Sequence, residues 1–115
     1  MGDLLCAALT ERTNGQIVSR EDELEMGHGN RLDLLLRLEA AGETLTIAVE
    51  TLRHAYPRDI QGAVWRLEEY KLTAGSDMEI IPMVAAEALS PGAREQLRNR
   101  GIAYFERNGN LHLRR

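Results

Sequence analysis

Residues 31–52 read RLDLLLRLEAAGETLTIAVETL. One set of alternate positions is hydrophobic over 31–39 (32, 34, 36 and 38) and again over 44–51 (45, 47 and 49), and the short segment 41–43 between them contains glycine. An alternation of period two is typical of β-strands, and a short turn with glycine joins antiparallel neighbours. This segment therefore predicts a β-hairpin.

Two acidic residues stand out in the predicted hairpin, one from each strand. The face of the first strand opposite Asp33 carries Leu32, Leu34, Leu36 and Leu38, and the face of the second opposite Glu50 carries Leu45, Ile47 and Val49. Carboxylates on neighbouring strands can converge on a divalent cation such as Mg²⁺ or Mn²⁺, which prefers oxygen ligands. Asp33 and Glu50 are therefore the candidate metal ligands and catalytic residues.

The segments on both sides of the hairpin predict further elements. The expected helices cover 3–12, about 17 residues from Pro57 up to Gly75, and the segment from Pro91, capped by Ser90, to Gly101. The expected strands cover 16–25, 78–85, 102–105 and 111–113, and the apolar strand 78–85 is predicted to be central. The order α-β-β-β-α-β-α-β-β predicts one α/β domain over residues 1–115.

Composition limits the class of protein. The 115 residues are 43% hydrophobic, contain a single cysteine and show neither an apolar run long enough for a membrane span nor a signal peptide, so we expect a cytoplasmic protein. The net charge of −4 argues against strong non-specific binding of nucleic acid. Lys and Arg number 4 against 10 Asp and Glu in residues 1–50, but 10 against 8 in residues 51–115. Either a metal site beside a phosphate-contacting face or chance variation accounts for this asymmetry.

An Asp on one strand and a Glu on the next, followed by a helix and another strand, resembles the core of the PD-(D/E)XK nucleases. This family includes restriction endonucleases and Holliday-junction resolvases. The matching text is LDLLL at 32–36 and AVETLR at 48–53, and the resemblance extends over about residues 30–113. The resemblance implies a restriction-endonuclease-like core, with a mixed central sheet flanked by helices, and DNA as a partner. Domains of this length in the family often act as homodimers.

The sequence departs from the family motif at Leu52, where the family has a lysine that activates the attacking water. Some members recruit a basic residue from elsewhere, often from the following helix. The available cations here are Arg53, Arg58, Arg66 and Lys71. We take Lys71 and Arg53 as candidate catalytic replacements.

Three functional hypotheses remain open at this point. The first is a degenerate nuclease-like domain that binds nucleic acid or protein, or dimerises, in a defence or regulatory system. The second is an active Mg²⁺- or Mn²⁺-dependent DNA endonuclease with a relocated basic residue, and the third is an unrelated α/β domain. Trp65 lies off the predicted buried stripe of its helix, which suits either a partner or dimer contact or the covering of a helix end. Glu11, the acidic run 21–25 and the three histidines are expected at the surface.

Overall fold

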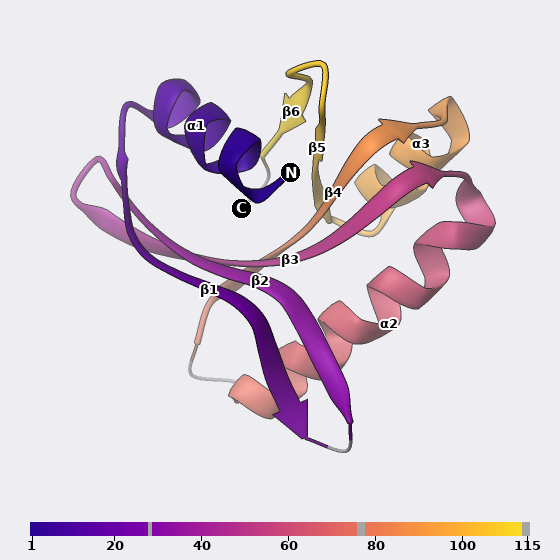
Figure 1. The fold of residues 1–115 in the computed structure, drawn as a ribbon, viewed down its shortest axis with the longest axis horizontal. Helices are drawn as coiled ribbons and strands as arrows, with labels where there is room; N and C mark the ends of the chain where they lie inside the picture. The colour runs from indigo at the N-terminus through magenta and orange to yellow at the C-terminus, as the bar shows by residue number, and fades with distance from the viewer. Residues whose placement is uncertain (28, 76–77, 114–115) are drawn as a thin grey trace.

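The computed structural model of the chain describes residues 1–27, 29–75 and 78–113 and has the predicted order of helices and strands (Figure 1). The helices are α1 (Gly2–Thr13), α2 (Pro57–Ala74) and α3 (Pro91–Asn99). The strands are β1 (Gln16–Gly27), β2 (Asn30–Ala40), β3 (Glu43–Ala55), β4 (Ile80–Leu89), β5 (Ala103–Glu106) and β6 (Leu111–His112). Among these described residues, no helix is long and apolar enough to cross a membrane.

The strands form one mixed sheet in the order β1-β2-β3-β4-β5-β6. Strands β1, β2 and β3 are antiparallel neighbours, β3, β4 and β5 are parallel, and β6 returns antiparallel to β5. Parallel neighbours need a crossover, which α2 supplies between β3 and β4, and α3 between β4 and β5. The prediction of a hairpin followed by a central apolar strand is confirmed.

Helices cover both faces of the sheet (Figure 1). On one face α1 contributes Leu5 and Leu9 to a buried cluster, and on the other α2 and α3 contribute residues such as Leu67 and Leu97 to a second cluster. A sheet with two buried faces accepts hydrophobic residues at consecutive positions, because both sides of each strand are removed from water. This explains the unbroken leucines of β2.

The predicted assignment of Leu32 to the face of the other β2 leucines is wrong. Leu34, Leu36 and Leu38 pack on the α1 side, whereas Leu32 packs on the α2 side together with Leu35. The neighbouring β1 residue Glu23 has a φ of +53°, which departs from extended backbone. The regular alternation therefore fails next to Asp33.

Strand boundaries differ from the predicted ones where polar residues continue a strand. Strand β3 extends to Ala55, because its last residues pair in parallel with β4 as far as Leu89. The predicted loop 27–30 loses its two end residues to strands, since Gly27 of β1 pairs with Asn30 of β2; His28 lies outside the described residues. Arg53 and His54 thus belong to a strand although their polarity suggests a loop.

The starts of α2 and α3 lie next to each other, beyond the ends of β3 and β4. The Tyr56 backbone N–H donates to the Asp59 carboxylate at 2.9 Å, and the Ser90 hydroxyl accepts the Ala93 N–H at 3.1 Å. A methyl group added at Gly92 would lie 3.2 Å from Cγ of Pro57. Glycine therefore permits the two helices to begin side by side.

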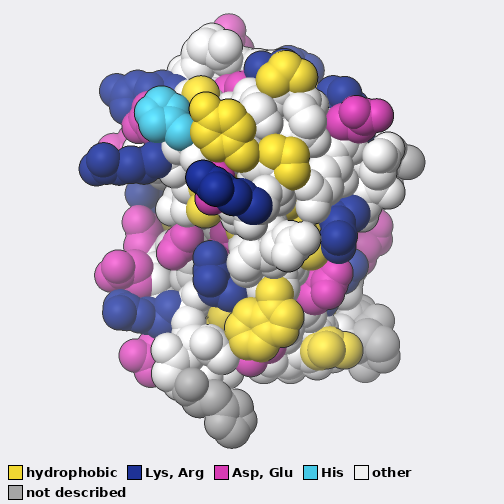
Figure 2. All heavy atoms as spheres, turned by 90° about the vertical axis from the view of Figure 1, so that its right-hand side faces the viewer, with side chains coloured by type: hydrophobic (Ala, Val, Ile, Leu, Met, Phe, Trp, Pro, Cys, Tyr) yellow, Lys and Arg dark blue, Asp and Glu magenta, His cyan; other side chains and the backbone are white. Residues whose placement is uncertain are grey.

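The outer side of α2 is not covered by any described element. Its buried side carries Ile60, Ala63, Val64, Leu67 and Tyr70. Trp65 and Leu72 on the opposite side are 56% and 84% exposed. Figure 2, which views the face that includes α2, shows hydrophobic side chains standing out among charged ones.

Two leucines of α2 give a matched test of this packing. Leu67→Ala removes a side chain that is 1% exposed, and we expect a loss of about 2–4 kcal/mol in the free energy of unfolding. Leu72→Ala, at a position that is 84% exposed, should change it by less than about 0.5 kcal/mol. Urea titration of both variants at low protein concentration measures the difference. Equal losses would contradict the described orientation of α2.

Candidate functional site

The two predicted acids lie where β2 separates from β3. The backbone ladder between these strands ends at the pair Leu34–Val49, and β2 then turns away from β3 together with β1 (Figure 1). Glu50 Oε2 accepts the Asp33 backbone N–H at 2.9 Å, and Asp33 Oδ2 accepts the Thr51 backbone N–H at 2.8 Å. Each carboxylate takes the place of a backbone carbonyl as acceptor, which keeps the diverging strands joined.

A basic side chain reaches this junction from α2. The Nε–H of Arg66 donates to Oε1 of Glu50. A methyl group added at Gly62, one turn earlier, would lie 3.8 Å from an Arg66 guanidinium nitrogen, so the side chain runs back toward the start of the helix, as helical side chains do. The Glu50 side chain is 1% exposed and that of Arg66 is 37% exposed. A buried carboxylate is thus bound by a guanidinium that also touches water.

Burial dominates the electrostatics of Glu50. Loss of hydration raises the pKa of this carboxyl above its ordinary value of 4.5, and the negative charge of Asp33 acts in the same direction. The hydrogen bonds from Arg66 and from the Asp33 amide oppose the rise without cancelling it. The ionised form of Glu50 therefore depends on its two donors.

The residues at this junction do not fit a divalent cation well. Both oxygens of Glu50 already accept hydrogen bonds, and Oδ2 of Asp33 accepts the Thr51 hydroxyl at 3.1 Å in addition to the Thr51 amide. Within the described ranges, no group of three or more His, Cys, Asp and Glu side chains is placed to hold a metal ion. The guanidinium also puts positive charge against Glu50, where it would repel a cation. The arrangement fits an internal ion pair.

The structure places the other candidate cations away from Glu50. Arg53 is exposed on β3, and Lys71 is exposed on α2 in a depression that includes Leu72. Neither makes an ion pair with any residue that the structure describes. Leu52 is partly buried against the core on the α2 side, so the position of the family's lysine contributes to packing here.

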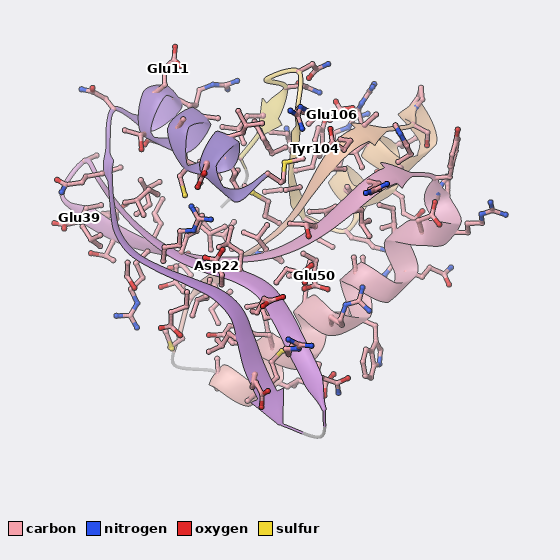
Figure 3. The ribbon with its side chains drawn as sticks, in the orientation of Figure 1. Glu11, Asp22, Glu39, Glu50, Tyr104 and Glu106 are labelled. Carbon is pink, nitrogen blue, oxygen red and sulfur yellow. The ribbon has the colours of Figure 1, made fainter. Side chains whose placement is uncertain are left out.

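The remaining predicted surface residues are largely where they were expected. Glu11 points away from the sheet on α1, on the face opposite the one that α2 covers (Figure 3). The acids at 21–23 and 25 are exposed on β1, and Asp22 pairs with Arg20. His54 is exposed, whereas His112 is partly buried and stacks on Tyr104 with ring centres 5.1 Å apart.

Sequence reasoning missed a second buried acid, Glu106, at the end of β5 (Figure 3). This side chain is 2% exposed and accepts hydrogen bonds from the Leu89 amide, the Arg94 guanidinium and the Asn110 side chain. Burial raises its pKa, but the hydrogen bonds, that of Asn110 foremost, outweigh burial and lower it. Glu106 thus fastens β4, α3 and the β5–β6 turn together. The available signal was an acid two residues before the turn Asn108-Gly109-Asn110.

Comparison with known proteins gives a structural likeness without a sequence match. No family model matches the chain, and no curated protein matches it. A repair endonuclease from Pyrococcus abyssi superimposes with a TM-score of 0.60 at 15% identity, over 92% of this chain and 46% of that one. The EndoMS–dsDNA complex superimposes with a TM-score of 0.57 at 17% identity, over 87% of this chain and 41% of that one. The chain has the restriction-endonuclease-like fold.

The likeness covers only part of each neighbour. A protein of unknown function with a TM-score of 0.59 and 14% identity matches over 90% of this chain and 54% of its own. The restriction-endonuclease-like domain described here therefore spans about half the length of the solved structures that it matches. The TM-scores establish a shared fold, and at identities of 14–17% the likeness extends to the fold alone.

The two buried acids should affect stability with opposite dependence on pH. Because the pKa of Glu50 is raised, the folded state binds more protons than the unfolded state just above pH 4.5, and the free energy of unfolding falls as pH rises through the raised pKa. Glu50→Gln keeps an acceptor without charge, so its stability relative to wild type should increase over that range. For Glu106, whose pKa is lowered, the stabilisation is lost as pH falls below 4.5.

Urea titrations of wild type, Glu50→Gln and Glu106→Gln between about pH 3 and 8 measure both effects. The Glu106→Gln variant should be less stable than wild type at pH 7 and should approach it in acid. A constant difference between Glu50→Gln and wild type at every pH would show that burial does not raise the pKa of Glu50.

Proposed function

We propose that this domain is a non-catalytic DNA-binding module on the restriction-endonuclease-like fold. The observation that carries the proposal is the ion pair between Arg66 and Glu50. The guanidinium supplies from within the chain the positive charge that a divalent cation would bring. The two acids then join β2 to β3, and the domain keeps the fold without hydrolysing phosphodiesters.

The lysine position supports the same function. Leu52 packs against the hydrophobic core on the α2 side and has no group that could accept a proton from water or stabilise charge on a phosphate. The two exposed cations nearest in sequence, Arg53 and Arg58, are on β3 and in the first turn of α2. The site therefore has an arginine in place of the metal and a leucine in place of the lysine. Both residues stabilise the fold rather than serve hydrolysis.

The corner between β3 and α2 is the surface best suited to DNA. Arg53, His54 and Arg58 are exposed there, and Tyr56 is 57% exposed. A depression of about 290 Å³ lies between the ends of β3 and β4, beside the starts of α2 and α3. Arginine side chains and the N–H groups of helix starts are the usual donors to phosphate oxygens. The fold of EndoMS, which was solved with double-stranded DNA, agrees with such a partner.

A metal-dependent DNA endonuclease is the second candidate function. The reach of Arg66 from α2 to Glu50 favours it, because a basic residue relocated to the following helix would occupy this place. Asp33 and Glu50 would then be the Mg²⁺ or Mn²⁺ ligands, and Arg66 rather than Lys71 or Arg53 would be the helper. Binding of Mg²⁺ or Mn²⁺ at Asp33 and Glu50 is expected of the endonuclease and not of the non-catalytic module.

Calorimetric titration of Mg²⁺ and Mn²⁺ into wild type and Asp33→Ala, with a plasmid-nicking assay on the same samples, tests the non-catalytic part. We expect no nicking by wild type at millimolar metal, because Arg66 and the backbone donors occupy the carboxylates. Nicking that disappears in Asp33→Ala would overturn the proposal in favour of the endonuclease.

Fluorescence anisotropy with a labelled DNA duplex tests the DNA part. Arg53→Glu combined with Arg58→Glu should weaken binding by at least about tenfold and reduce the salt dependence of the dissociation constant, since phosphate contacts release counterions. Arg12→Glu combined with Arg37→Glu makes the same change of charge elsewhere on the surface and is the matched control. Equal weakening by both pairs would indicate a response to net charge alone and would overturn the assigned surface.

A further inference from the structure

The outer side of α2 brings four exposed residues together near the start of the helix. Arg58, Gln61, Gly62 and Trp65 are spaced at i, i+3, i+4 and i+7, which places them on one side of the helix. This side is opposite the buried stripe that contains Leu67, and it belongs to the face that Figure 2 views. The four residues form one surface, called here the 58–65 face, which no element in the described ranges covers.

The charge of this side changes sign along the helix. Over residues 57–67, Arg58 and Arg66 are basic, and the one acid, Asp59, already accepts the backbone amide that precedes the helix. Glu68 and Glu69 follow within the next turn. A polyanion is therefore attracted to the first half of α2 and repelled by the part that follows.

The fold of this chain does not require glycine at position 62. A methyl group there would meet only the Arg66 guanidinium, at 3.8 Å, which is an ordinary contact distance. Alanine is also the better helix former at an exposed position inside a helix. Glycine in such a place lets another molecule approach the backbone closely.

The dimensions of α2 match the major groove of double-stranded DNA. A helix with its side chains is about 10–12 Å across, and the groove is about 12 Å wide. Arg58 and Trp65 lie about 10 Å apart along the helix axis, which is the rise of about three base pairs. The corner between β3 and α2 lies beyond the start of the helix, next to Arg58, where it would meet phosphates at the edge of the groove.

We propose that the 58–65 face binds in the major groove of a DNA duplex and that Gln61 determines a preference for adenine. The proposal rests on the DNA-binding function proposed above and adds a base preference to it. A glutamine amide can donate to N7 of adenine and accept from its N6 amino group, a pattern that distinguishes adenine from the other bases. Gly62 lies at the closest approach, and Trp65 offers an apolar surface to a thymine methyl group.

Selection by the wild-type chain from a pool of randomised duplexes measures the base preference. We expect a preferred site of about three to four base pairs that contains adenine, because the 58–65 face spans that length. Fluorescence anisotropy then compares the dissociation constants of the selected duplex and of a scrambled one. Circular dichroism checks that each variant remains folded.

Removal of one nitrogen atom from the DNA tests the groove and the residue together. 7-Deaza-adenine at the preferred position lacks N7 but keeps base pairing and the minor-groove edge, so it should raise the wild-type dissociation constant by at least about fivefold. Gln61→Ala should weaken binding of the ordinary duplex by a similar factor and show no further loss with 7-deaza-adenine. Gln16→Ala, exposed on β1, is the matched control and should keep both the preference and the effect of 7-deaza-adenine.

Two further readouts follow the approach of the helix to the DNA. Gly62→Ala should stabilise the fold against urea and yet weaken binding of the selected duplex by about threefold or more, because the methyl group holds the helix away from the bases. Trp65 is the single tryptophan, so its fluorescence emission should change when the selected duplex binds.

Failure of this proposal can be distinguished from failure of the DNA-binding function. A chain that binds no duplex of the pool at low salt would overturn both. If Arg53→Glu with Arg58→Glu weakens binding, but all duplexes bind equally and neither Gln61→Ala nor 7-deaza-adenine has an effect, the DNA-binding function stands and the adenine preference is overturned. Unchanged Trp65 emission at saturating selected duplex would show that the 58–65 face lies away from the DNA and would also overturn the proposal.

Discussion

The separation of β2 from β3 is the constraint on which the rest of this structure depends. A sheet loses backbone hydrogen bonds wherever two of its strands part, and buried N–H groups without acceptors are costly. Here the Asp33 and Glu50 carboxylates accept the amides that the ladder leaves behind. The β1–β2 pair can then turn aside while β3 continues alongside β4, with which it stays paired. Without side-chain acceptors long enough to reach across the gap, the strands would have to stay together or leave these part-buried amides without a hydrogen bond.

Two buried acids fasten the two halves of the sheet by the same physical means. Glu50 joins the antiparallel half to α2, and Glu106 joins the parallel half to α3 and to the last turn. Each takes one backbone amide and one arginine, so its buried charge is compensated on two sides. The two acids differ in the direction of their pKa shifts. Burial raises the pKa of Glu50, whereas hydrogen bonding lowers that of Glu106.

The sequence was sufficient for the elements whose pattern is local. The alternation over 31–39 and 44–51 predicted the hairpin, and the apolar run near residue 80 predicted the central strand. Hydrophobic periodicity could not assign Leu32, because both faces of the sheet are buried and the alternation fails beside Glu23. It also ended β3 too early, since Arg53 and His54 are polar residues kept in the strand by pairing with β4.

The site was predictable in part for the same reason. Asp33 and Glu50 were identified from their places on adjacent strands, and the structure brings them together. Which cation meets them depends on the rotation of α2 about its axis, and that rotation is set by the burial of Leu67 and its neighbours. Arg66 adjoins Leu67 in sequence, and Gly62 leaves room for its side chain. The sequence pattern alone did not distinguish Arg66 from Lys71 as the cation that reaches the acids. Glu106 depended on Arg94 and Asn110, whose proximity arises only in the folded chain.

The unequal exposure of Arg66 and Glu50 fixes the order in which this pair could disappear during divergence. Losing the arginine first would leave a carboxylate that is 1% exposed without its cation, a change that costs about 3–5 kcal/mol for a buried pair. Replacing the glutamate first by a residue that still accepts the Asp33 amide, such as glutamine, leaves a guanidinium that is 37% exposed and can turn into water. Related chains that lack the pair should therefore include some that retain the arginine alone and few that retain the glutamate alone.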